Sequence, residues 1–498
     1  MHARLCLALF GATALAGCSL EPKYIRPAPA VPLSWPVGDA YLRHTEATLP
    51  SITYKDLFRD PRLQAIIARA LVDNQNIAIA LANVASARSQ YRVQRAALLP
   101  GIDASSRIST GVSGSTQSGN TTGTGNAGTG TSGSRVDARR TSYTADIGIS
   151  AFEIDLFGRV RSLSKAALQE YLATEAGVRA ARLTLVAEIA STYLTFATDR
   201  SLLAIAHDTQ VSASRSVDLT LARLRGGIAP RTDLRQAETV LDQARSDAAN
   251  LTTVVAQDRN ALELLVGGTI ADSELPPSIE SVDSLLSELP AGLDSKILLR
   301  RPDVVEAEYR LRATNARIGA ARANFFPTVS LTALAGFASS ALSSLFTGGG
   351  LNWSVAPGVS LPLFDGGANR GNLAYANAQR DLAVAQYRQT VQTAFREVAD
   401  ALARRGTIGL QTQAQIDLEA AARDSDMLAE ARYKEGIDPF LSRLDTQRTL
   451  YSARRALASA RLLRADNLVT LYRVLGGDML IDGEPPPTMP AAPVKAGD

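Results

Sequence analysis

Residues that could act as nucleophiles, metal ligands or general bases are scarce in this chain of 498 residues. It contains only three His and two Cys, and His2 and Cys6 lie in an N-terminal stretch with the pattern of a removable signal. The mature chain would keep His44, His207 and Cys18. Zinc sites and Cys-His or His-triad catalysis need more such residues. We therefore expect no metal site, no cofactor and no enzymatic activity.

Two short motifs match enzyme patterns without the context that those enzymes need. Ser162-Leu163-Ser164-Lys165 fits the S-x-x-K pattern of some serine hydrolases, but the chain has no Ser-Asp-Asn or Lys-Thr-Gly partner. Gly123–Gly128 fits G-x-G-x-x-G, yet it lies in residues 109–134, where 21 of 26 residues are Gly, Ser or Thr. We interpret that stretch as a flexible extracellular loop, with a bare linker as the alternative.

The N-terminus predicts export and lipid attachment. Arg4 precedes an apolar run, Leu5 to Leu15, that is too short to span a bilayer and is typical of a signal peptide. Leu15-Ala16-Gly17-Cys18 resembles the bacterial lipobox, in which cleavage precedes a Cys that is then acylated. An ordinary cleavage site with an incidental Cys is the alternative. Acyl chains on Cys18 would form a lasting anchor, and Ser19 fits sorting to the outer membrane.

Charge and hydropathy narrow the class of protein. With 52 Lys and Arg against 49 Asp and Glu, a nucleic-acid binder is not expected. No segment after the signal offers 18 consecutive strongly apolar residues, which argues against a helical membrane protein. Ala323–Phe364 is nevertheless uncharged, and its apolar residues alternate with Ser, Thr, Ala and Gly. This period of two predicts membrane strands near residues 101–109, 141–152, 328–338 and 352–363.

The same alternation places three charged residues, Asp103, Arg107 and Asp146, opposite the apolar positions, where they would face a wet barrel lumen. The edge of a soluble sandwich is the alternative. Four strands cannot close a barrel, and a membrane tolerates no open sheet edge, so the barrel must be shared between chains. A dimer would give eight strands and a trimer twelve, and the residues alone leave that choice open.

The chain contains two copies of one unit. Ala222–Pro230 recurs as Ala431–Pro439 and Leu265–Gly268 recurs as Val474–Gly477, both 209 residues later. Each copy has the order helix, strand, strand, long helix, tight turn, helix. The expected organisation is a signal at 1–17, an acylated N-terminal segment at 18–62, a first repeat at 63–268, a linker at 269–302, a second repeat at 303–477 and a tail at 478–498.

The helices of each repeat are unusually long. We expect helices from about 157 to 225 and 365 to 434, each roughly 100 Å at 1.5 Å per residue. Helices 63–99 and 231–266 would together match the first of these in length. Apolar residues in 231–266 follow a coiled-coil spacing that is broken only at Asp258: Leu234, Ala237, Leu241, Ala244, Ala248, Leu251, Val255, Leu262 and Leu265. Abundant Ala favours a tightly packed helical cylinder over an ordinary bundle.

Each helical hairpin turns at a glycine, in tips at residues 226–230 and 435–439. Gly227 and Gly436 suit the positive φ that ends a helix. Asp438 and Pro439 suit the N-cap and first residue of the return helix, expected at 440–475.

Several of these features together resemble the outer membrane factor family, the TolC-like exit ducts of tripartite efflux pumps, and its NodT-type lipoprotein branch. They are the duplicated layout, the lipobox, both Gly-Ile tips, Leu299-Arg300-Arg301-Pro302-Asp303, and Ala320–Pro327. The resemblance covers roughly residues 40 to 480. It implies an α+β membrane protein, in which a homotrimer shares a twelve-stranded β-barrel that continues as a periplasmic α-helical coiled-coil barrel. It also implies an equatorial region, to which 18–62 and 269–302 would contribute.

The resemblance also implies sites at the tips. Leu441 would be the apolar constriction of a closed aperture, and Asp445 a lumen-facing acidic ring that pairs with Arg448. Charges that only solvate a helix end are the alternative. Arg443 departs from the apolar residue expected there. Contacts with an adaptor protein would involve Arg225, Gly227, Thr232, Asp233, Arg235, Gly436, Asp438 and Arg443.

The expected function is therefore a passive, gated exit duct for drugs or other small solutes, in the outer membrane of a Gram-negative bacterium. Its expected partners are a periplasmic adaptor, an inner-membrane transporter and outer-membrane lipid. The alternative is a lipid-anchored structural or adhesive coiled-coil stalk without a transport role. An open lumen and a gate at the tips separate the two hypotheses.

Overall fold

The computed structural model describes residues 19–28, 31–32, 35–36, 53–113, 138–283, 295–347 and 350–477. The signal, Cys18, most of the Gly/Ser/Thr-rich stretch and the tail lie outside the described residues. The chain divides into two compact units that each collect segments from both repeats. Unit 1 comprises residues 1–24, 88–169 and 312–381, and unit 2 comprises 25–87, 170–311 and 382–498.

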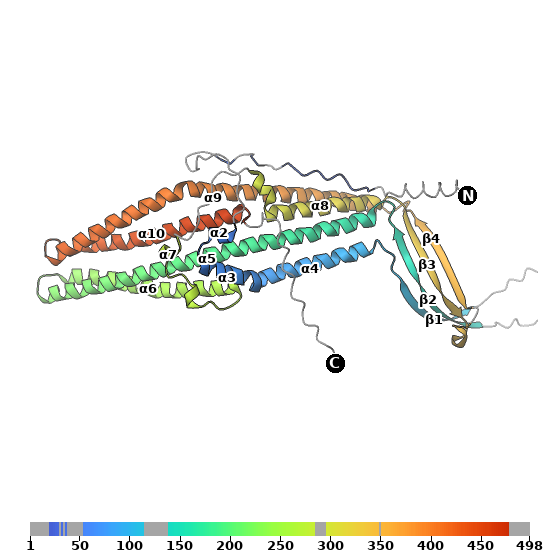
Figure 1. The fold of residues 1–498 in the computed structure, drawn as a ribbon, viewed down its shortest axis with the longest axis horizontal. Helices are drawn as coiled ribbons and strands as arrows, with labels where there is room; N and C mark the ends of the chain where they lie inside the picture. Colours follow the sequence, from blue (N-terminus) through green and yellow to red (C-terminus); the bar gives the residue numbers. More distant parts are fainter. Residues whose placement is uncertain are drawn as a thin grey trace, which may run out of the picture. The chain divides into compact units, whose positions relative to one another are not determined.

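Unit 1 contains one antiparallel sheet with the strand order β1-β2-β3-β4 (Figure 1). The strands are β1 (Asp103–Ser113), β2 (Ala138–Ile154), β3 (Thr328–Ser339) and β4 (Leu351–Ser360). The first hairpin extends further than expected, because residues 109–113 continue β1 instead of starting a loop. Hydroxyl pairs link this extension to β2: Ser109 with Ser142 at 2.8 Å and Thr110 with Thr141 at 3.3 Å.

A bulge in β2 changes which residues share a face. The pairing of β2 with β3 shifts between Ile149 and Phe152, and Ala151 between them has a φ of 51°. Strict alternation through 141–152 predicts Ala151 on the same face as Ile149, but the inserted residue moves Phe152 onto that face instead. The bulge thus keeps the large apolar side chain on the apolar face.

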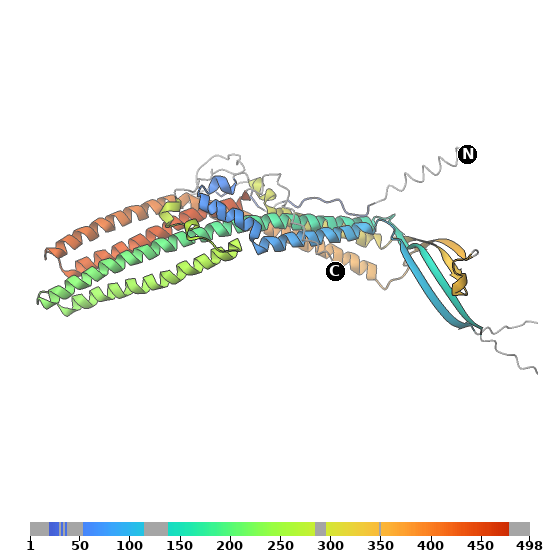
Figure 2. The ribbon, with the colours of Figure 1, turned by 60° about the horizontal axis from the view of Figure 1, so that its bottom comes forward.

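The long helices repeat with the same offset as the sequence motifs. Helices α5 (Arg159–Arg225) and α9 (Ala368–Lys434) each have 67 residues, and both boundaries lie 209 residues apart. Their return helices are α6 (Arg231–Val266) and α10 (Phe440–Val474). In unit 2, α6 runs beside α5 and α10 beside α9 (Figure 2).

The expected single helix 63–99 is two helices, α3 (Pro61–Asp73) and α4 (Gln75–Ala96). Asn74 separates them: its Oδ1 accepts a 2.8 Å hydrogen bond from the backbone N–H of Asn76, and its Nδ2 donates to the carbonyl of Leu265 at 2.7 Å. The start of α4 therefore meets the end of α6.

By length and composition, Pro61–Ala96 is the one helical stretch of the described residues apolar enough to cross a membrane, a criterion that core helices also meet.

The second repeat builds the equivalent joint with different chemistry. Arg301 precedes α8 (Pro302–Ala323) and donates through Nη1 to the carbonyl of Val474 at 3.0 Å. Val474 follows Leu265 by 209 residues. The buried guanidinium also pairs with Asp303 and Glu397, at 2.8 and 2.9 Å.

The remaining elements are α2 (Tyr54–Leu57), η1 (Asp272–Glu274), α7 (Ile279–Asp283), η2 (Ser295–Arg300) and η3 (Leu342–Ser344).

The apolar seam of α6 is buried along most of its length. The buried residues are Leu234, Ala237, Leu241, Ala244, Ala248, Leu251, Leu262 and Val266, the last in place of Leu265. Asp258 interrupts the seam as the spacing indicated. Burial, together with the neighbouring carboxyl group of Asp199 on α5, raises the pKa of Asp258 to about 7.

Candidate functional site

The sheet of unit 1 has one polar and one apolar face. Ser105 lies opposite Asp146 and Arg107 lies opposite Thr144, and residues opposite each other in antiparallel strands share a face. Because alternate residues along a strand also share a face, Asp103 and Arg107 lie on the same side as Asp146. The register therefore brings together the three charged residues expected to line a lumen.

The other face is apolar, and about half of its large side chains are exposed in the described chain. Its large side chains include Trp353 and Val355 of β4, which are 76% and 57% exposed. The apolar face is formed by Ile108, Tyr143, Ile147, Ile149, Phe152, Leu331, Phe337, Leu351, Trp353, Val355 and Val359. A contiguous apolar surface of this kind is typical of a membrane-facing or partner-facing sheet.

The two tips of unit 2 form the same kind of turn. Gly227 has a φ of 75° and Gly436 a φ of 76°. In the first tip, Ile228 donates to the carbonyl of Arg223 at 3.0 Å, and in the second, Ile437 donates to that of Arg432 at 2.9 Å. Glycine at the left-handed position lets each helix end satisfy its last carbonyl groups and reverse.

Asp438 does not cap the return helix. Pro439 is the N-cap of α10 and forms no side-chain cap hydrogen bond. The carboxylate of Asp438 instead accepts two hydrogen bonds from Arg432, at 2.7 and 2.8 Å. These hydrogen bonds lower the pKa of Asp438 and raise that of Arg432. Our N-cap expectation was wrong because the nearby guanidinium competes for the carboxylate.

Arg223 joins the first tip to the second. Its guanidinium lies 4.3 Å from the ring centroid of Tyr433 and donates to the carbonyl groups of Tyr433 and Lys434, at 2.7 and 3.1 Å. The ring of Tyr433 in turn packs edge-on against Phe440 at 5.5 Å. Ala237 and Leu444 complete this buried cluster. The contact satisfies carbonyl groups at the end of α9 with a cation.

Sequence reasoning missed Arg223, although the repeat contained a signal. Arg223 and Arg432 occupy equivalent positions, 209 residues apart. Arg432 pairs with Asp438, whereas the position equivalent to Asp438 in the first tip is Ala229. The missing acidic partner leaves Arg223 free to contact the other tip.

Arg443 is an interior residue, which corrects its assignment to an adaptor-contact surface. It is 3% exposed, and its guanidinium is hydrogen-bonded to Asp426 and, at 3.1 Å, to Glu430. Burial raises the pKa of Asp426 even though Arg443 opposes that rise. A hydrogen bond from Lys434 lowers the pKa of Glu430. The triad therefore holds α9 and α10 together near the second tip.

The residues expected at the aperture are exposed but not paired with one another. Leu441 is 63% exposed, and Asp445 and Arg448 are also exposed. Within the described chain no ion pair joins Asp445 to Arg448, so that expectation is wrong for the single chain. Arg448 instead borders a hollow of about 190 Å³, which is lined by Thr209, Thr239, Val240, Gln243, Ala244, Gln447, Arg448 and Tyr451.

The other expected contact residues lie mostly on the surface of the tips. Arg225, Gly227, Thr232, Arg235 and Gly436 are exposed, and Asp233 is half-buried. Arg235 forms an ion pair with Glu238 of its own helix at 2.6 Å.

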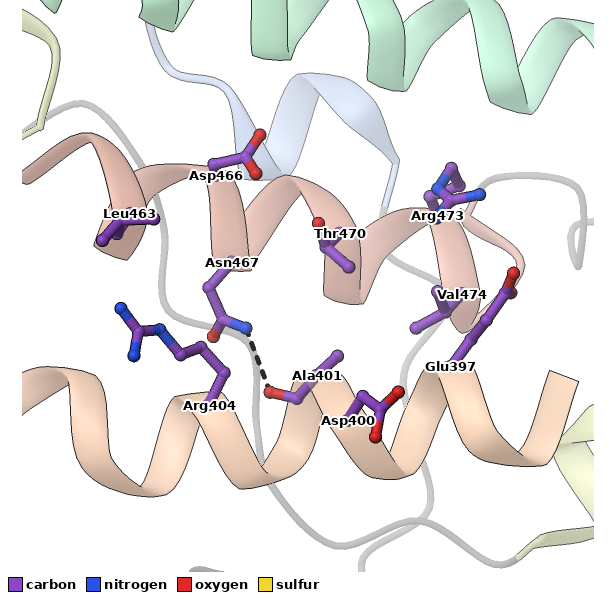
Figure 3. Close-up of a pocket in the computed structure, with 10 residues that line it drawn as sticks. All are labelled: Glu397, Asp400, Ala401, Arg404, Leu463, Asp466, Asn467, Thr470, Arg473 and Val474. Carbon is purple, nitrogen blue, oxygen red and sulfur yellow. Dashed lines mark hydrogen bonds between the residues drawn. The ribbon is translucent and has the colours of Figure 1, made fainter. Parts of the chain in front are cut away.

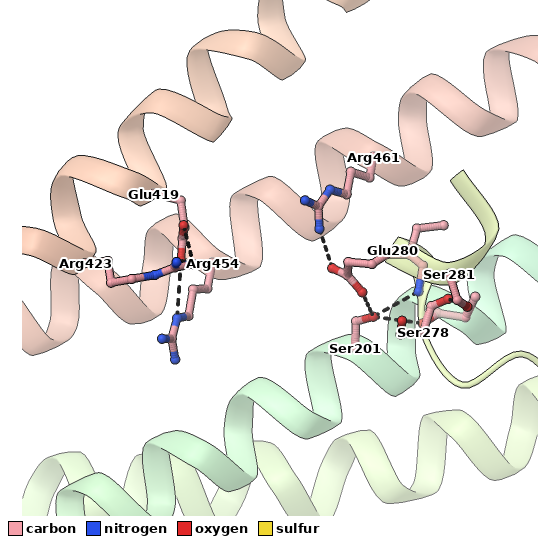
Figure 4. A network of polar contacts seen from close by, with 10 residues as sticks. Ser201, Ser278, Glu280, Ser281, Glu419, Arg423, Arg454 and Arg461 are labelled. Atoms are coloured by element: carbon pink, nitrogen blue, oxygen red, sulfur yellow. Dashed lines mark hydrogen bonds and ion pairs between the residues drawn. The ribbon is translucent and has the colours of Figure 1, made fainter. Parts of the chain in front are cut away.

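Polar contacts away from the tips tie the helices of unit 2 together (Figure 4). Glu419 of α9 accepts hydrogen bonds from Arg423 of its own helix and forms a 3.5 Å ion pair with Arg454 of α10. Glu280 of α7 contacts Ser201 of α5 at 2.9 Å and Arg461 of α10 at 2.5 Å. Two helical hairpins are thus joined through α7.

A second hollow, of about 300 Å³, lies between α9 and α10 (Figure 3). It is lined by Glu397, Asp400, Ala401, Arg404, Leu463, Asp466, Asn467, Thr470, Arg473 and Val474. Asn467 donates across it to the carbonyl of Ala401 at 3.0 Å. Among the described residues, no group of three or more His, Cys, Asp or Glu is placed to hold a metal ion.

The sheet has one polar and one apolar face, and the duplicated sequence forms long paired helices. This combination is typical of an outer-membrane channel, and comparison with known proteins agrees. The sequence profile of the outer membrane efflux protein family matches residues 66–268 and 293–477. The chain belongs to this family. The predicted family, the α+β fold class and the outer-membrane location in Gram-negative bacteria are thereby confirmed.

Individual relatives match over almost the whole chain. The solvent efflux pump outer membrane protein SrpC of Pseudomonas putida is 42% identical over 476 residues, which cover 95% of this chain and 97% of that protein. Outer membrane protein OprJ of Pseudomonas aeruginosa is 39% identical, with coverage of 94% and 95%. The open state of the MtrE outer membrane channel of Neisseria gonorrhoeae has a TM-score of 0.80 and 34% identity, covering 93% of this chain and 99% of that one.

Proposed function

We propose that this chain is the outer-membrane exit duct of a tripartite efflux pump and works as a homotrimer. The two-faced sheet carries the proposal: its apolar face suits lipid, its polar face suits a wet lumen, and the sheet order leaves β1 and β4 at open edges. Three copies would close a twelve-stranded barrel wide enough for solutes to pass.

The duct is passive and performs no chemistry. A periplasmic adaptor and an inner-membrane transporter would supply the coupling and the energy. The names of the relatives, which include solvent, toluene and antibiotic efflux pump proteins, favour drugs or small apolar solutes as cargo. Acylation of Cys18 would add a lipid anchor in the same membrane.

The gate lies at the tips, where contacts between neighbouring copies and contacts within one chain both act. Leu441 and Asp445 are exposed in the first turns of α10, beside the second tip, so three copies around an axis would form an apolar ring and an acidic ring. Because Asp445 has no ion-pair partner within the described chain, its charge is available to a neighbouring copy, and repulsion in an unpaired ring favours opening. Arg223 holds the two tips of one chain together and opposes that movement.

Blocking the lumen tests the duct against the stalk. Ser105 lies on the polar face and Ser106 on the apolar face, at neighbouring positions of β1. In cells that depend on this protein for export, a bulky thiol reagent should slow efflux of a fluorescent substrate for Ser105→Cys. The reagent should leave efflux unchanged for Ser106→Cys. Unchanged efflux in fully labelled Ser105→Cys, or no export by wild type that reaches the outer membrane, would favour the stalk.

A further inference from the structure

The segment that follows Cys18 is fastened to unit 1 by three side chains. Arg322 of α8 donates to the carbonyl of Leu20 at 3.3 Å, and Asn315 of α8 donates to the carbonyl of Pro22 at 2.8 Å. Lys165 of α5 forms a 2.8 Å ion pair with the carboxylate of Glu21 between them. We call residues 19–24 the clamp segment.

Gly319 makes room for this segment on α8. A Cβ atom at Gly319 would lie 2.9 Å from Cα of Glu21 and 2.8 Å from Oγ of Ser162. Asn315, Gly319 and Arg322 are spaced four and three residues apart, so they lie on one face of the helix. The clamp segment therefore runs along that face, with Leu20 nearest the end of α8.

This arrangement determines where Cys18 can reach. Cys18 precedes Leu20 by two residues, so their Cα atoms are at most about 7 Å apart in an extended chain. Arg322, which holds Leu20, is followed by Phe325 and Phe326 in the turn before β3, and these are 40% and 39% exposed. Phe326 stacks on Phe157 with ring centroids 4.8 Å apart. An acyl chain on Cys18 would thus emerge beside exposed aromatic surface.

We propose that Phe325 and the stacked pair Phe157–Phe326 form a docking site for an acyl chain of Cys18, and that the clamp segment holds the chain there. The occupant is the protein's own lipid, because the distance from Leu20 to Cys18 confines it to this end of α8. Docking covers exposed aromatic surface with a hydrocarbon chain. The proposal rests on the acylation of Cys18 proposed above.

Photo-crosslinking in native outer membranes tests the docking site. p-Benzoylphenylalanine replaces Phe326 in the full-length protein, and the control carries it at Tyr375, an exposed aromatic residue of α9 in the same unit. After irradiation and digestion, mass spectrometry should find the Phe326 peptide joined to the acylated N-terminal peptide. The Tyr375 control should give no such adduct. Adducts with bulk phospholipid alone, or no adduct at position 326, would overturn the proposal.

A pair of glycine substitutions tests the clamp. Gly319→Ala should reduce the crosslink at least several-fold and speed tryptic cleavage after Lys23, because the new methyl group displaces Glu21. Gly371→Ala, where a Cβ meets nothing within 4 Å, should change neither. Glu21→Ala provides a second variant, which removes the ion pair without crowding the helix. An unchanged crosslink in both Gly319→Ala and Glu21→Ala would refute the clamp.

Export assays on the same variants separate this proposal from the duct. If Gly319→Ala and Glu21→Ala lose the crosslink but still export substrate, the result supports docking and leaves the duct intact. A full crosslink in wild type without any export would overturn the duct while docking stands.

Discussion

The guanidinium of Arg223 lies over the ring of Tyr433, 4.3 Å from its centroid, and donates a 2.7 Å hydrogen bond to the same residue's carbonyl oxygen. One side chain of the first tip thus contacts both the ring and the backbone of the second. A hydrogen bond from a charged group is worth about 1.5–3 kcal/mol. If the tips separate on opening, this contact must break first.

Arg223→Ala should therefore loosen the tips. A loss of about 1.5 kcal/mol would shift the opening equilibrium roughly tenfold. Spin labels on Thr232→Cys and Glu435→Cys, one on each tip, should show a longer and broader distance distribution by electron paramagnetic resonance. Arg235→Ala is the control, because the ion pair that Arg235 forms among the described residues is with Glu238 of its own helix. Identical distributions in wild type and Arg223→Ala would contradict the role of this contact.

Arg443→Met should destabilise the α9–α10 hairpin. Removing one partner of a buried ion pair costs about 3–5 kcal/mol, because the carboxylate of Asp426 is left without its cation. The apparent melting temperature by circular dichroism should fall clearly. Arg448→Met, at an exposed position without an ion pair in the described chain, should change it little. Adding Asp426→Leu to Arg443→Met should recover much of the loss, and a failure to recover would contradict the charge explanation.

The two faces of the sheet should respond oppositely to a charge. Val355 lies on the apolar face and Ser354 on the polar face, at adjacent positions of β4. A Lys on the lipid face near the bilayer centre costs about 2–4 kcal/mol, whereas a Lys in the lumen remains solvated. Val355→Lys should lower the amount of folded protein in outer-membrane fractions, and Ser354→Lys should not. Equal amounts of the two variants would argue against the assignment of the faces.

Stability should depend on pH through Asp258. Its pKa is raised to about 7 in the folded protein, above the ordinary value of 3.8. The folded state therefore binds the extra proton between these values, and the free energy of unfolding falls as pH rises from about 4 to about 7. Each pH unit contributes at most about 1.4 kcal/mol, and solvent screening of this half-buried carboxyl group lowers that value, so the decrease between about pH 5 and pH 7 should be about 1–3 kcal/mol. Melting curves of Asp258→Asn should lack this decrease; an undiminished pH dependence would assign it elsewhere.

Much of the fold follows from local patterns in the sequence. The glycine turns at Gly227 and Gly436 and the alternation in β3 and β4 depend on neighbouring residues alone. The 209-residue repeat is visible when the two halves of the sequence are compared. The return helix α6 begins and ends at the residues expected for it. Periodicity and glycine positions sufficed because these elements need no distant partner to define their limits.

Features that depend on distant partners could not be predicted. Asn74 divides a continuous helical pattern because its amide reaches Leu265, 191 residues away. The bulge at Ala151 is defined by pairing with β3, and no local signal marks it. The sequence predicts Arg443 at the surface, because its partners Asp426 and Glu430 lie 17 and 13 residues away across the tip and no local pattern indicates them.

Planar-bilayer conductance of the purified protein tests the gated duct most directly. Wild type should pass little current, because ion pairs between Asp445 and Arg448 of neighbouring copies would hold the tips closed. The double variant Asp445→Ala with Arg448→Ala should pass much more, because those ion pairs are gone. Arg235→Ala serves as the control and should behave as wild type. No current from any variant, in protein shown to be folded and trimeric, would contradict the duct. Equally large currents from all of them would keep the pore and refute the gate at the second tip.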